Sequence, residues 1–167
     1  MDRDIDARFM GLALGLANAA AEKGQTPFGA VVVDQDGRLI GEGHNTVRAD
    51  LDPTAHGEVV ALRDAWRRAG SRQALAGCTV YTSCEPCLLC SFVITQLGIS
   101  RVVFAARGSD VPTYKSLLGM DLLAASAWVN AQPDWPPIEV VPDFMREQAL
   151  ETIAAFAWQP DSKDTTP

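Results

Sequence analysis

The sequence of 167 residues contains no apolar run of about 20 residues, the length that a membrane-spanning helix requires. Its opening, Met1-Asp2-Arg3-Asp4, lacks the basic segment of a secretory signal peptide. Cysteine is scarce, with four residues, and two of them are close together as potential ligands, which argues against a disulfide framework. These absences predict a cytoplasmic protein with no membrane partner.

Basic residues are in the minority, with 14 Lys and Arg against 21 Asp and Glu and a net charge of -7. Nucleic-acid binding draws much of its affinity from neutralised phosphates, so this charge makes a nucleic-acid partner unfavourable. From Asp121 to the end of the chain, only Arg146 and Lys163 are basic. The densest basic group has acidic neighbours and is typical of a solvated helix face: Arg63, Arg67, Arg68 and Arg72. Charge therefore favours a small-molecule substrate.

The chain length suits one domain with a hydrophobic core, which we expect over residues 1–160, followed by a polar tail over 161–167. Hydrophobic periodicity predicts helices over residues 4–23, 56–69, 86–97, 116–130 and 145–158. Buried strands are predicted over 28–33, 39–45, 79–82, 101–105 and 138–141. A turn over 34–37 makes the first two strands antiparallel, whereas the later alternation of strand and helix predicts parallel pairing.

Two short motifs contain the residues most suited to chemistry: His56-x-Glu58 and Pro86-Cys87-x-x-Cys90. A catalytic zinc needs three protein ligands and one open position for water, and one imidazole with two thiolates meets that requirement. A helix that begins at Pro86 would place both cysteines near its N-terminus, where the helix dipole favours thiolates. Glu58 is well placed to carry a proton to and from the metal-bound water.

Other sites could use the same cysteines. A C-x-x-C pair after an apolar strand also fits a thiol redox module, and the spacing of Cys84, Cys87 and Cys90 resembles part of an iron–sulfur ligand run. A closed structural zinc would need a fourth ligand from Cys84, Cys78 or His44. A non-enzymatic zinc or redox module is therefore the alternative from another functional class, but it gives no role to Glu58.

Four segments together resemble the cytidine-deaminase-like superfamily: residues 27–30, 43–45, 52–58 and 82–90. The resemblance covers residues 3–107 and points to the branch that holds bacterial guanine deaminases, fungal-type cytosine deaminases and tRNA adenosine deaminases. It implies an α/β fold in which a central five-stranded mixed sheet forms the middle layer of a three-layer α/β/α sandwich. It also implies Zn²⁺ as the cofactor and assembly as a homodimer.

The resemblance assigns roles to individual residues. It identifies His56, Cys87 and Cys90 as the metal ligands and Glu58 as the proton shuttle. Asn45 corresponds to an asparagine that hydrogen-bonds the base, and Phe28 to a pocket wall. Two departures are visible: position 57 is Gly where many members have Ala, and the loop over 108–114 matches no branch.

The loop over 108–114 follows a predicted strand, the place where α/β sheets present ligand-facing residues, so we also expect Asp110 to contact the substrate. Trp158 or Phe156 could close the pocket or pack in the core. The expected function is zinc-dependent hydrolytic deamination of a free nucleobase. Guanine is favoured because residues 52–56 and 82–87 look most like guanine deaminases; cytosine, a nucleoside or tRNA adenosine are the alternatives.

Overall fold

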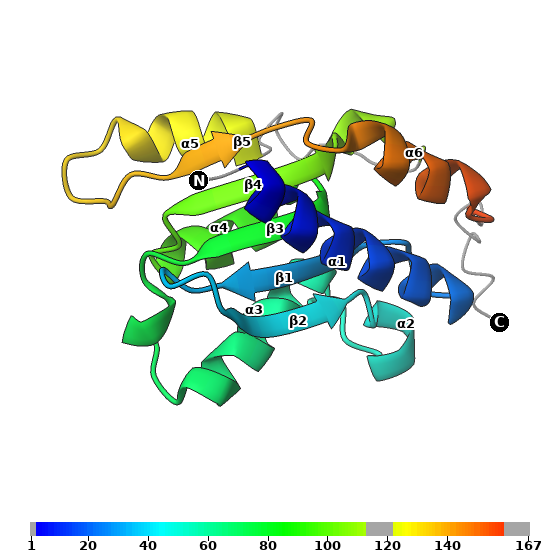
Figure 1. The fold of residues 1–167 in the computed structure, drawn as a ribbon, viewed down its shortest axis with the longest axis horizontal. Coiled ribbons are helices and arrows are strands. Elements are labelled where there is room, and N and C mark those ends of the chain that lie inside the picture. The colour runs from blue at the N-terminus through cyan, green and yellow to red at the C-terminus, as the bar shows by residue number, and fades with distance from the viewer. Residues whose placement is uncertain (1–2, 113–121, 159–167) are drawn as a thin grey trace, which may run out of the picture.

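A computed structural model of the chain describes residues 3–112 and 122–158. Their centre is a five-stranded sheet of order β2-β1-β3-β4-β5 (Figure 1). Its strands are β1 (Gly29–Val33), β2 (Leu39–His44), β3 (Thr79–Cys84), β4 (Arg101–Ala106) and β5 (Glu139–Val141). β1 pairs antiparallel with β2 and β3, whereas β3, β4 and β5 are parallel to one another. The predicted five-stranded mixed sheet is confirmed.

Helices cover both faces of this sheet, so the predicted three layers are confirmed. α1 (Arg3–Glu22) and α6 (Arg146–Ala155) lie together on one face, and α1 crosses in front of the sheet in Figure 1. α3 (Gly57–Ala69), α4 (Leu88–Gln96) and α5 (Leu122–Asn130) cover the other face. No helix within the described ranges is long and apolar enough to cross a membrane.

Strand residues contribute alternately to two separate cores, because successive side chains of a strand point to opposite faces. Val31 and Tyr81 pack under α1 and α6, whereas Val32 and Val80 pack under α3 and α4. These strands are buried on both faces, which explains why their sequences are continuous apolar runs.

Gly41 allows α3 to pack directly on β2. A Cβ atom at this position would lie 2.5 Å from the carbonyl oxygen of Ala61 on α3, which is too close for any side chain. Gly43 makes a similar approach, because a Cβ atom there would lie 2.9 Å from the carbonyl oxygen of Gly57, so the first turn of α3 lies beside the end of β2, where Asn45 follows. The two segments that hold Asn45 and Glu58 are therefore neighbours.

A buried polar cluster ties α1 to the sheet. Asp6, which is 4% exposed, accepts two hydrogen bonds of 2.8 Å from the Arg101 guanidinium and one of 2.7 Å from the Tyr81 hydroxyl. Burial alone would raise the pKa of Asp6, but the hydrogen bonds from Arg101 and Tyr81 outweigh it and lower the pKa. The cluster therefore holds an ionised carboxylate between helix and sheet.

Several boundaries differ from the predicted ones. α4 begins at Leu88 and not at Pro86, because Cys87 keeps an extended backbone and caps the helix. α6 ends at Ala155, before the predicted end at 158. The short helices α2 (Val47–Asp50), η1 (Gln73–Leu75) and η2 (Gly108–Asp110) were not predicted. Residues 113–121, which include the start of the helix predicted over 116–130, and the tail over 161–167 lie outside the described residues.

Candidate active site

The three predicted metal ligands converge at the starts of two helices. His56 caps the N-terminus of α3, and Cys87 caps that of α4, with Cys90 in its first turn. The Nδ1 atom of His56 lies 3.4 Å from Sγ of Cys87 and 3.5 Å from Sγ of Cys90. The two sulfur atoms are 3.7 Å apart. Residues separated by 31 positions in the chain thus form one compact group of donor atoms.

These distances fit a tetrahedral zinc ion. With Zn–S bonds of about 2.3 Å and a Zn–N bond of about 2.0 Å, tetrahedral geometry places the sulfurs about 3.8 Å apart and each sulfur about 3.5 Å from the nitrogen. The observed separations match this pattern. Cys84, an alternative fourth ligand, directs its thiol to the carbonyl oxygen of Arg107 at 3.8 Å. Within the described residues the donor set is His56, Cys87 and Cys90, which leaves one tetrahedral position open.

The two thiols differ in acidity. A hydrogen bond with Cys90, assisted by His56 and opposed by burial, lowers the pKa of the Cys87 thiol to about 4. Cys90 is fully buried, and its contact with Cys87 together with burial raises the pKa of its thiol well above the usual value. The hydrogen bond with Cys87 raises the pKa of His56, against the effect of burial. A bound cation would favour thiolate at both cysteines.

Glu58 lies beside the metal ligands and is 6% exposed. Its Oε2 atom is 3.5 Å from Sγ of Cys90, and α3 positions it one residue beyond Gly57. Burial, followed by the negative charge of Cys87, raises the pKa of Glu58 to about 7. A carboxyl group with a pKa near neutrality can both accept and donate a proton, which is the property of a general acid–base group.

A cavity of about 340 Å³ opens over the ligand group. It brings together the predicted residues Phe28, Asn45, His56, Glu58 and Cys87. The Asn45 side-chain oxygen accepts a hydrogen bond of 3.2 Å from the backbone N–H of Val47, which fixes the orientation of the amide. The backbone N–H of Asn45 donates to the carbonyl oxygen of Phe28 at 2.9 Å.

Gly57 allows the backbone at Phe28, which forms part of the cavity wall, to pack closely against the start of α3. A Cβ atom at position 57 would lie 3.0 Å from the carbonyl oxygen of Phe28, so a larger residue would require the strand entrance to move by a few tenths of an ångström.

Trp158, for which the sequence left pocket closure and core packing open, lines the cavity and also packs against the core under α1 and α6. Its ring centroid lies 6.2 Å from that of Phe28, with an angle of 47° between the planes, and 5.0 Å from that of Phe156. Its indole N–H donates to the carbonyl oxygen of Ile153 at 2.9 Å, which anchors the side chain to α6. Phe156 supports Trp158 from the side.

The structure places Asp110 away from the expected contact with substrate. Both of its carboxylate oxygens accept hydrogen bonds from Arg146, at 2.9 and 2.5 Å, and one also accepts from the backbone N–H of Arg107 at 2.8 Å. Asp110 does not line the cavity; its neighbour Val111 does. The position of Asp110 after a strand end predicts a pocket group, whereas in the structure its carboxylate forms an ion pair with a residue 36 positions later.

Other cavity residues were not predicted from the sequence: Thr26, Val47, Arg48, Glu85 and Val111. Glu85 lies within the cysteine motif, between Cys84 and Pro86, and this position was a signal in the sequence that Glu85 lies close to the site. Arg48 belongs to the unpredicted helix α2 and is exposed at the rim. Val111 lies in the loop over 108–114, which was expected to face a ligand, whereas no pattern in the sequence distinguishes Arg48 from an ordinary surface residue.

Comparisons with known proteins agree with this geometry. The family model of the cytidine and deoxycytidylate deaminase zinc-binding region matches residues 3–106. The chain is 48% identical to the guanine deaminase of Bacillus subtilis (strain 168) over 134 residues, which is 80% of each protein. It is 41% identical over 98 residues to the tRNA-specific adenosine deaminase of Aquifex aeolicus (strain VF5), which covers 59% of this chain, and it spans 64% of that enzyme's length.

A solved structure shows the same architecture. The guanine deaminase of Nitrosomonas europaea superimposes with a TM-score of 0.76 at 27% identity, covering 87% of this chain and 81% of that one. The family match includes every ligand of the candidate zinc site, together with Glu58 and Asn45. The chain therefore belongs to the family defined by the cytidine and deoxycytidylate deaminase zinc-binding region.

Proposed function

We propose that this protein is a zinc-dependent hydrolytic deaminase of a free nucleobase, with guanine as the favoured substrate. The observation that carries the proposal is the buried Glu58 carboxylate beside the His56, Cys87 and Cys90 group, at the floor of a cavity. A structural zinc or a thiol redox pair has no use for a carboxyl group of near-neutral pKa in this position.

Different cavity residues would have different roles in the reaction. His56, Cys87 and Cys90 would hold zinc, which when bound supplies Lewis-acid activation of a water molecule. Glu58 takes a proton from the attacking water and delivers it to the ring nitrogen next to the amine-bearing carbon. A C–O bond forms at this carbon; Glu58 then takes the second proton from the added hydroxyl group and passes it to the amine, and the C–N bond breaks. The products are ammonia and the oxo-substituted ring.

The neighbouring side chains would orient the ring. Because the Asn45 oxygen is held by the N–H of Val47, its NH₂ group is the part suited to donate to an acceptor on the base. Phe28 and Trp158 present aromatic surfaces to a planar heterocycle. Val111 closes a further part of the wall.

Cavity size and charge favour a free base over a nucleic acid. A volume of about 340 Å³ is near the lower end of the range of about 300–1,000 Å³ for small-molecule sites. Among the residues that line the cavity, Arg48 is positively charged, whereas Glu58 and Glu85 are acidic. A phosphate backbone requires basic side chains, so these two acidic residues do not suit a nucleic acid. The 48% identity to a guanine deaminase supports guanine among the bases.

We further propose that the protein is a homodimer. An apolar groove of about 400 Å³ lies between α3 and α4, and Trp66 and Phe92 on its rim are 45% and 64% exposed. Large exposed apolar side chains that gather around one groove are typical of a protein–protein contact. A second copy of the chain would cover them.

The test of function is ammonia release from guanine, cytosine, adenine and their nucleosides by the zinc-loaded protein, beside inosine formation in tRNA at low salt. We expect guanine to be deaminated with the highest kcat/KM. The Glu58→Gln variant, prepared in parallel, provides the background. Efficient tRNA editing without turnover of any base or nucleoside would overturn the proposal and favour the second candidate, a tRNA adenosine deaminase, which the similarity to the Aquifex aeolicus enzyme suggests.

A further inference from the structure

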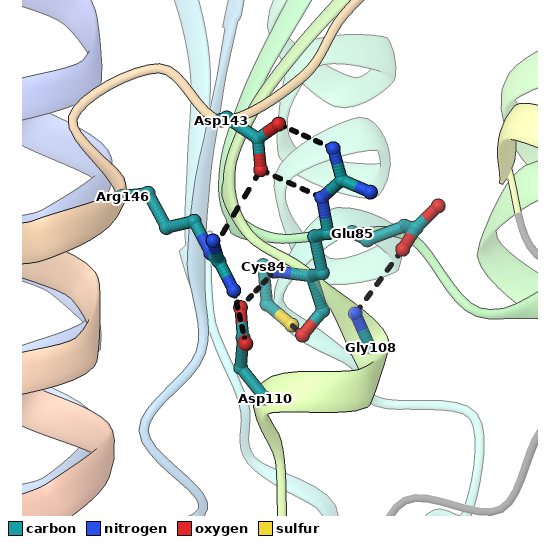
Figure 2. Close-up of polar contacts among 7 residues, drawn as sticks. Cys84, Glu85, Gly108, Asp110, Asp143 and Arg146 are labelled. Atoms are coloured by element: carbon teal, nitrogen blue, oxygen red, sulfur yellow. Dashed lines mark hydrogen bonds and ion pairs between the residues drawn. The ribbon is translucent and has the colours of Figure 1, made fainter.

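Four charged side chains form a cluster beside the cavity, between the end of β4 and the start of α6 (Figure 2). We call it the clamp: Arg107, Asp110, Asp143 and Arg146. The guanidinium of Arg146 binds the Asp110 carboxylate at 2.9 and 2.5 Å, and that of Arg107 binds the Asp143 carboxylate at 2.7 and 2.5 Å. The Nε atom of Arg146 lies 3.8 Å from Asp143, so the two pairs form one network.

The clamp is continuous with one wall of the cavity. The carbonyl oxygen of Arg107 accepts from the Cys84 thiol at 3.8 Å, and the backbone N–H of Gly108 donates to the Glu85 carboxylate at 3.1 Å (Figure 2). Val111 follows directly after Asp110 and is 8% exposed. Three of these residues, Cys84, Glu85 and Val111, line the cavity, whereas the four charged side chains do not.

The same cluster fixes a second part of the cavity through α6. Arg146 is the first residue of this helix, and Trp158, which lines the cavity, is anchored to the last turns of the helix by its bond to Ile153. Asp110 therefore links the Val111 segment to the helix that supports Trp158.

The geometry of these contacts suits positioning. Isolated ion pairs at a surface contribute little to stability, but bidentate pairs between arginine and carboxylate fix distance and orientation. The side chain of Asp110 is only 12% exposed. The hydrogen bonds from Arg146 lower the pKa of Asp110, although burial opposes them, so the pair is ionised at neutral pH.

We propose that Asp110 and Arg146 are positioning residues that determine specificity: their ion pair sets the spacing between the Val111 wall and the α6–Trp158 wall, and hence which ring fits between them. The inference rests on the proposed deaminase function and deepens it. Neither residue touches the substrate, and neither takes part in proton transfer.

The kinetic test compares Arg146→Gln and Asp110→Asn with wild type on every base that wild type deaminates. We expect KM to rise by about tenfold, with kcat and zinc content within about twofold, because the change loosens the walls and leaves Glu58 and the ligands in place. The double variant should be no worse than either single variant, and Arg146→Lys, which keeps the charge but loses the fork, should be intermediate.

A merely structural role predicts a different result. Loss of folded protein lowers the apparent kcat and leaves KM unchanged. The matched control is Arg68→Gln, which breaks a bidentate pair with Asp64 on α3, at 3.1 and 2.7 Å, without a contact to the cavity. Its KM should equal that of wild type. Unchanged KM in both Arg146→Gln and Asp110→Asn would overturn the proposal.

A second measurement does not depend on turnover. NMR spectra of the zinc-loaded protein should show shifted or broadened signals for the Val111 methyl groups and the Trp158 indole N–H in Arg146→Gln, and unchanged signals in Arg68→Gln. Unperturbed signals in Arg146→Gln would overturn the clamp whatever the substrate. Absence of ammonia release by wild type would instead overturn the proposed function.

Discussion

The Nδ1 atom of His56 lies 3.4 Å from the Sγ atom of Cys87, although the two residues cap different helices on one face of the sheet. Helix N-termini carry a partial positive charge, and the N-terminus of α4 favours the thiolate form of Cys87 and Cys90. The packing of α3 and α4 against the same sheet thus assembles the donor atoms of the metal site.

We expect about one zinc ion per chain, held by these donors. Cys90→Ser and His56→Ala should lose most of the metal, as measured by elemental analysis after dialysis. Cys84→Ser is the matched control: Cys84 is also buried near the site, but its thiol is directed to Arg107. It should retain zinc. A cobalt-substituted protein whose absorption spectrum indicates three thiolates would contradict the open site.

Glu58→Gln should separate binding from chemistry. The amide keeps the size of the side chain but cannot shuttle a proton, so kcat should fall by about 10²- to 10⁴-fold. Zinc content and melting temperature should remain close to those of wild type, because the residue is not a ligand in the site described. Near-normal turnover would assign proton transfer to another group.

Trp66→Glu should yield a monomer at micromolar concentration in light scattering, because it places a charge on the rim of the groove between α3 and α4. Trp128→Glu is the control, since Trp128 is 59% exposed on α5 and lies outside that groove. It should remain dimeric. A monomeric wild type would refute the dimer itself.

Asp6→Asn should lower the free energy of unfolding at pH 7 by about 3 kcal/mol, since it removes one partner of a buried ion pair. The pKa of Asp6 is lowered in the folded protein, so its contribution is complete above the unfolded pKa of about 3.9 and disappears as the pH falls through the folded value.

The difference between wild type and Asp6→Asn in chemical denaturation should therefore be constant from about pH 5 to 7 and shrink below about pH 4. Asp4→Asn changes the same residue type in the same helix turn at an exposed position. Its effect should be small at every pH. A difference that grows at low pH would contradict the role of the ionised carboxylate.

Local sequence was sufficient to predict the features that depend on local chemistry. The apolar runs of β3 and β4 are bounded by turns and had to be buried, and the spacing of Cys87 and Cys90 suits only a few kinds of site. The ion pair of Asp110 was not predicted, because its partner Arg146 comes 36 positions later and the chain gives no sign of which arginine will meet which carboxylate. Trp158 was ambiguous for the same reason: its aromatic neighbour on the cavity wall, Phe28, lies 130 positions earlier in the chain.

The family match ends at Ala106, the last residue of β4. The candidate zinc ligands and Glu58 lie before this point, and Val111, Trp158 and all four residues of the clamp lie after it. The cavity therefore combines residues from within the family match, among them Phe28, Asn45 and Glu58, with Val111 and Trp158 from beyond it. Substitutions confined to residues 107–112 and 122–158 would therefore alter part of the cavity wall while leaving His56, Glu58, Cys87 and Cys90 unchanged in the sequence.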